Sequence, residues 1–139
     1  MFLSSLFQNE KMHQGSKDFF KKIESDSEKF CIVISILTLF EIFQSYYRKT
    51  KSKKGLEALQ ESFIDLNLSK KLRIFNLEAS FLAYFVTYHD LFDLKTSDTV
   101  IALIAHREKV PLITWDSDLI RRCKGKIKTY TPQEFLNSL

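Results

Sequence analysis

The sequence predicts an α/β fold of three layers, in which helices cover both faces of a parallel sheet. Short apolar, β-branched runs alternate with longer amphipathic stretches, and this alternation is typical of parallel strands joined by helices. Only 3 glycines and 2 prolines interrupt the 139 residues, so long helices are expected. The length fits a single domain over residues 1–139, and 45% hydrophobic with 27% charged residues excludes disordered and collagen-like classes.

The first half of the chain is expected to contain a helix, a strand and two further helices. The strand carries apolar residues on both faces, which is typical of a buried parallel strand. Thr38 and Glu41 have the spacing of a capping box, so the next helix is predicted to open there. The basic residues 48–54 predict an exposed connection. The other elements are expected at residues 11–24 (helix), 30–36 (strand) and 55–64 (helix).

The second half repeats the alternation of strand and helix. Residues 96–98 are predicted to cap an apolar helix, and Asp116 begins a shorter one. Thr131 is the expected cap of a C-terminal helix with Pro132 at its first position. The remaining elements are strands over residues 72–77, 110–115 and 127–130 and helices over residues 78–88 and 99–106.

Three acidic residues, Glu41, Asp98 and Asp116, stand beside apolar runs near predicted helix starts. Each is a good helix-terminus residue, since the helix dipole favours acids there. In a parallel sheet, however, the carboxyl ends of neighbouring strands share one edge, where the three would converge. Two carboxylates about 4 Å apart repel by roughly 4 kcal/mol at a dielectric of 20. Oxygen ligands favour Mg²⁺ or Mn²⁺, which can activate water for phosphodiester hydrolysis.

Four stretches, taken in order and at their spacing, resemble a known family. They are ILTLFE at residues 36–41, SDTVIA at 97–102, PLITWDSD at 111–118 and YTPQEFL at 130–136. The chain resembles the PIN domain over essentially its whole length, and more narrowly the VapC-type toxins of toxin-antitoxin pairs. The resemblance implies that Glu41, Asp98 and Asp116 are catalytic acids that bind the metal. It also implies that Asp118 is a further metal-site acid and that Thr114 supports the site.

The resemblance implies the activity of an endoribonuclease that hydrolyses RNA phosphodiester bonds with Mg²⁺ or Mn²⁺. A cognate antitoxin holds such enzymes in check, and a homodimer is expected. The alternative is a catalytically impaired remnant that acts only as an antitoxin-binding or self-association module. A phospho-accepting receiver domain fits poorly, because it needs paired acids after the first strand and a lysine after the last.

The N-terminal segment departs from the PIN pattern. PIN domains open with an apolar strand that ends in Asp-Thr-Asn and lies at the centre of the sheet, whereas residues 1–7 resemble the helix that follows it. We therefore expect an N-terminally truncated domain that lacks its first strand, so that the gene product starts upstream or the copy is degraded. Without the first acid, the remaining site should bind metal weakly.

Charge and cysteine content agree with a nucleic-acid partner inside the cell. The 21 lysines and arginines exceed the 17 acids, and the net charge of +4 suits an anionic partner. Residues 48–54 have two interpretations: they contact RNA phosphates, or they form a solvated loop at the surface. Cys31 and Cys123 have no metal-ligand spacing, and the longest apolar run is too short for a bilayer, so a cytoplasmic protein without membrane contact is expected.

Overall fold

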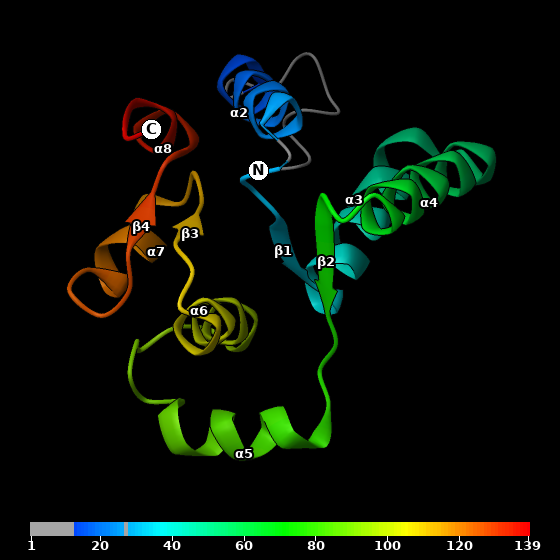
Figure 1. Cartoon of the computed structure of the whole chain (residues 1–139). Helices are drawn as coiled ribbons and strands as arrows, with labels where there is room; N and C mark the ends of the chain where they lie inside the picture. Colours follow the sequence, from blue (N-terminus) through cyan, green and yellow to red (C-terminus); the bar gives the residue numbers. More distant parts are fainter. Residues whose placement is uncertain (1–12, 27) are drawn as a thin grey trace. The chain divides into compact units, whose positions relative to one another are not determined.

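The computed structural model describes residues 13–26 and 28–139, and the chain divides into two compact units (Figure 1). The first unit ends at Asn76 and the second covers Leu77–Leu139. Each unit combines helices with one pair of parallel strands, which confirms the predicted mixed α/β class. The helix expected at residues 1–7 lies outside the described residues.

The first unit holds a strand pair and the two long helices that pack on it. Strands β1 and β2 pair in parallel, with Ile32 opposite Leu72 and Ser35 opposite Phe75. Helix α3 contacts β1 and α4, and α4 contacts β2. The elements are α2 (His13–Ser25), β1 (Ile32–Ser35), α3 (Ile36–Thr50), α4 (Lys53–Leu68) and β2 (Leu72–Phe75).

The core of the first unit lies between α3, α4 and β2. Its buried members are Leu39, Ile42, Leu59, Phe63 and Leu72. Helical spacings of three and four residues place the paired side chains of α3 and of α4 on one face of each helix. Phe43 packs edge to face on Phe63, with ring centroids 5.6 Å apart, a favoured geometry for aromatic pairs.

Strand β1 is shorter and less buried than predicted. Ile32, Val33 and Ile34 are only partly buried, although an apolar run of this kind indicates a strand covered on both faces. Within the described residues β1 has one strand neighbour, β2.

Helix α3 begins before the predicted capping box, and the prediction that Thr38 caps it is wrong. Ser35 is the N-cap, and its side chain accepts a hydrogen bond from the N–H of Leu37 at 3.1 Å. The strand therefore passes into the helix without a connecting loop. Glu41 consequently lies in the second turn of α3 rather than at the third helical position.

The basic stretch is mostly helical, so the predicted connection over residues 48–54 is wrong. Arg48 lies in the last turn of α3 and Lys53 begins α4. Lys51 adopts the left-handed conformation, with φ of 53°, and its N–H donates to the Tyr47 carbonyl at 2.8 Å. Ser52 then caps α4, so two residues without glycine or proline turn the chain.

The second unit is built around helix α6, whose buried residues run from Thr99 and Val100 to Ala105. Strands β3 and β4 pair in parallel, with Leu112 opposite Thr129, and both are shorter than predicted. The expected cap at Thr131 is confirmed, and reciprocal bonds between Thr131 and Glu134 complete a capping box there. The elements are α5 (Ala79–Tyr88), α6 (Thr96–Glu108), β3 (Leu112–Ile113), α7 (Ser117–Cys123), β4 (Thr129–Tyr130) and α8 (Pro132–Asn137). No helix in the described part of the chain is long and apolar enough to cross a membrane.

We expect Phe63→Ala to lower the free energy of unfolding by roughly 3–5 kcal/mol, because it empties a core site. The Phe63 side chain is 2% exposed, whereas the adjacent Ile64 is 47% exposed on the outer face of the same helix. Ile64→Ala is the matched control and should change stability by less than about 0.5 kcal/mol. Urea denaturation measures both, and equal losses would contradict this core.

Candidate active site

Asp98 lies in the first turn of α6 and is partly buried. The prediction that residues 96–98 cap the helix is wrong, because α6 already begins at Thr96. The N–H of Thr99 donates to the Lys95 carbonyl at 2.8 Å and its buried hydroxyl donates to the Leu94 carbonyl at 3.1 Å. These bonds draw residues 96–98 into the helix. The Asp98 carboxylate forms no hydrogen bond or ion pair with the described residues, and the helix dipole favours its charge.

Asp116 begins α7 as predicted. Its Oδ1 accepts hydrogen bonds from the N–H groups of Asp118 at 2.9 Å and Leu119 at 3.1 Å. The hydroxyl of Thr114 accepts the N–H of Asp116 at 3.1 Å, and the N–H of Thr114 donates to the Tyr130 carbonyl at 3.0 Å. Thr114 thus links the β3–β4 pair to the turn that presents Asp116. The Oδ2 of Asp116 takes no part in these bonds.

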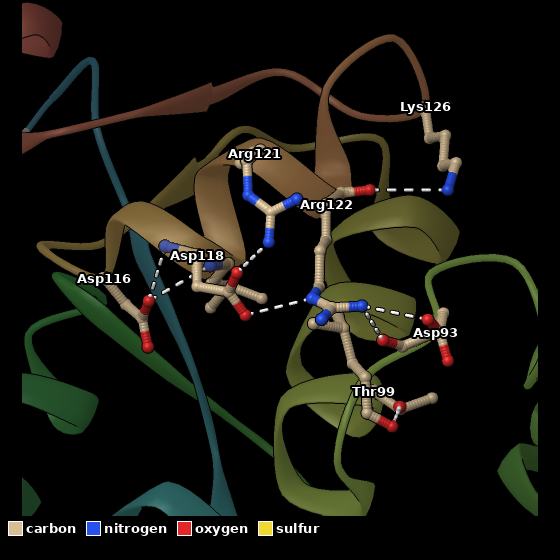
Figure 2. Close-up of polar contacts among 9 residues, drawn as sticks. Asp93, Thr99, Asp116, Asp118, Arg121, Arg122 and Lys126 are labelled. Carbon is tan, nitrogen blue, oxygen red and sulfur yellow. Dashed lines mark hydrogen bonds and ion pairs between the residues drawn. The ribbon is translucent and has the colours of Figure 1, made fainter.

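Asp118 is held by two arginines of its own helix (Figure 2). Its Oδ1 pairs with Arg121, and its Oδ2 accepts a hydrogen bond from Nε of Arg122 at 2.9 Å. Hydrogen bonds from Arg121 and then Arg122 hold the pKa of Asp118 below its usual value. Both carboxylate oxygens are therefore engaged, and a metal ion at Asp118 competes with both guanidinium groups.

Arg122 also reaches the loop that leads into α6. Its Nη1 donates to the main-chain carbonyl of Asp93 at 2.8 Å and to the Asp93 carboxylate at 2.9 Å (Figure 2). Asp93 has φ of 51°, in the left-handed region. One guanidinium group thus ties α7, which begins after Asp116, to the segment before the helix that carries Asp98. The spacing of four residues between Asp118 and Arg122 is a sequence signal for that pair, but Asp93 is 29 residues away and gives none.

The buried thiol of Cys123 indicates that Asp98 lies near α7. Burial raises the pKa of Cys123 to about 11; the charge of Lys126 lowers it and that of Asp98 raises it further. Cys123 is the last residue of α7, at the other end of that helix from Asp116. The second unit therefore carries two of the three predicted acids, each at the start of a helix.

Glu41 belongs to the first unit, where it is exposed on α3. It lines a shallow hollow together with Phe40, Gln44, Ser45 and Arg48. Within the described residues of either unit, no three His, Cys, Asp or Glu side chains lie close enough to hold a metal ion. The convergence of Glu41 with Asp98 and Asp116 stays a prediction.

These features define a mixed α/β protein with parallel strands. Its second unit carries acids at the starts of two helices, Asp98 at α6 and Asp116 at α7. The PIN domain family model matches residues 2–125, and the chain belongs to the PIN domain family. The α/β elements are consistent with a PIN-like fold. A search of curated proteins gives no match, and a search of solved structures gives none. PIN domains are generally nucleases and typically use divalent metal ions.

The two cysteines should differ sharply in reactivity, because the thiolate is the reactive form. Cys31 is exposed, whereas Cys123 is buried and its pKa is raised to about 11. At pH 7.5 we expect a disulfide reagent to modify only Cys31 rapidly in the native protein and both thiols in denaturant. Absorbance of the released thiolate measures this. Rapid modification of both native thiols would contradict the burial of Cys123.

Proposed function

We propose that this protein is a metal-dependent ribonuclease of the VapC type, with Glu41, Asp98 and Asp116 as the acids of the site. The observation that carries the proposal is the placement of Asp98 and Asp116 at the starts of two helices of one unit. Each has carboxylate oxygen outside its local hydrogen bonds, as a metal ligand requires. Membership of the PIN family supports nuclease chemistry.

The donor set fits a hard divalent cation, because carboxylate oxygens are the ligands that Mg²⁺ and Mn²⁺ prefer. Asp98 and Asp116 would hold the ion together with Glu41, and Asp118 would stand beside it. When bound, such an ion supplies a water nucleophile and offsets the negative charge that develops on the phosphodiester.

The surrounding residues would keep the acids in position. Two amides of the first turn of α7 orient Asp116, and the Thr114 hydroxyl holds the turn before it. Arg122 restrains Asp118 and the loop before α6. These bonds hold Asp116 at the start of α7 and tie α7 to the segment before α6.

The biological setting that we propose is a toxin-antitoxin pair. An antitoxin would restrain the enzyme, a homodimer would be the functional form, and the cytoplasm would be its location. The support is the motif order that resembles VapC-type toxins, the net charge of +4 and two free cysteines.

Two substitutions at Asp116 separate its role as a helix cap from its role as a metal ligand. Asp116→Asn keeps a side-chain oxygen that can cap α7, so stability should stay within about 0.5 kcal/mol, yet it removes the charge. We expect metal-dependent cleavage of single-stranded RNA to fall at least about 100-fold, measured on a fluorescent oligonucleotide. Asp116→Ala should lose the same activity and a further ~1 kcal/mol of stability, because it also removes the cap.

Asp98→Asn tests the second acid, with Asp90→Asn, an exposed acid of the same unit, as the control. We expect Asp98→Asn to abolish cleavage and Asp90→Asn to leave it unchanged. Excess EDTA should stop the wild type, and added Mn²⁺ should restore it. Undiminished cleavage in EDTA would refute the metal mechanism. A folded wild type without any metal-dependent cleavage would favour the non-catalytic binding module instead.

A further inference from the structure

The outer face of α3 and the start of α4 carries two adjoining hollows. The first, of about 450 Å³, is lined by Phe40, Phe43, Gln44, Tyr47, Lys53 and Leu56. The second, of about 410 Å³, is lined by Phe40, Glu41, Gln44, Ser45 and Arg48. Phe40 and Gln44 line both hollows, which therefore form one continuous surface with Glu41 as its single acidic lining residue. We call this surface, with the adjacent Lys51, the α3–α4 face.

Two aromatic rings of this face are open to solvent. The side chain of Phe40 is 61% exposed and that of Tyr47 is 40% exposed. They lie seven residues apart, which is two helical turns or roughly 10 Å along the same side of α3. Nucleic-acid bases stack on such rings with little dependence on base identity.

Cationic side chains border the rings. Arg48, Lys51 and Lys53 form no ion pair with any described residue, and residues 48–54 contain no acid. The ammonium nitrogen of Lys51 lies 5.9 Å from the centre of the Tyr47 ring. Cations beside exposed rings suit a ligand in which each aromatic base is linked to a negatively charged phosphate, as in a nucleic-acid strand.

We propose that the α3–α4 face binds single-stranded RNA and leads the strand to Glu41. The cations contact phosphates, the rings of Phe40 and Tyr47 stack on bases, and the Gln44 amide between them offers hydrogen bonds to base edges. The proposal rests on the proposed function, since it extends the site from Glu41. An acidic, apolar peptide would also match the charge. RNA is favoured because the most exposed apolar residues lining the two hollows are aromatic rather than aliphatic.

The test is RNA binding without cleavage, measured by fluorescence anisotropy of a labelled 12-nucleotide single-stranded RNA in excess EDTA. Tyr47→Ala should weaken binding about 5- to 100-fold, the usual cost of one lost stacking partner. Tyr88→Ala is the matched control, because Tyr88 is 38% exposed on α5, and it should leave binding unchanged. Phe40→Leu keeps apolar bulk without the ring and should also weaken binding, while circular dichroism confirms folding.

A second measurement isolates the charge. Lys51→Gln should reduce the slope of log affinity against log salt by about 0.7, the value for one phosphate contact on a single strand. Lys109→Gln is the matched control, because Lys109 ends α6 in the same left-handed conformation, with φ of 55°, and should leave the slope unchanged.

These binding measurements decide the proposal. Binding that Tyr47→Ala and Lys51→Gln leave unchanged would overturn it. Tighter, Tyr47-dependent binding of an acidic amphipathic peptide that displaces the RNA would assign the face to a protein partner instead. Asp98→Asn should still bind RNA normally, so loss of cleavage and loss of binding are separable. A protein that binds RNA through this face without ever cutting it would retain this proposal while the nuclease proposal fails.

Discussion

The structure depends on side chains that cap a helix at or soon after the end of a strand. Ser35 ends β1 and its hydroxyl accepts the N–H of Leu37 in α3, whereas Asp116 follows β3 by three residues and accepts two N–H groups of α7. These short connections hold the first turns of both helices close to the strands before them. Residues in these first turns are held in defined positions. Asp116 is both the cap of α7 and a candidate metal ligand.

The second unit adds a longer-range restraint to these junctions. The Arg122 guanidinium bonds to Asp118 on its own helix and to Asp93 before α6 (Figure 2). As an exposed ion pair it contributes little to global stability. Its directional bonds nevertheless restrain how α7 and the start of α6 lie, and these are the two places that carry acids. A metal site requires its ligand side chains to be held in position, because their geometry decides the affinity for the metal ion.

Sequence reasoning was most successful where one local interaction determines the outcome. Thr131 signals the cap of α8 and Asp116 signals that of α7, because side chain and amide lie within three residues. It failed where two residues compete. Ser35 and Thr38 are both good caps, and only the end of β1 favours Ser35. At α6 the buried Thr99 hydroxyl donates to the Leu94 carbonyl, and the helix begins at Thr96. The residue before it, Lys95, is the N-cap and makes no capping bond with its side chain. The left-handed turn at Lys51 and the Arg122–Asp93 contact have no local signal at all.

We propose that Glu41, Asp98 and Asp116 share one divalent cation. The most direct measurement is anomalous diffraction from crystals of the protein grown with Mn²⁺. We expect one strong peak about 2.1 Å from carboxylate oxygens of all three residues. Crystals with Asp98 and Asp116 well ordered, no peak between them, and Glu41 on a remote surface would contradict it.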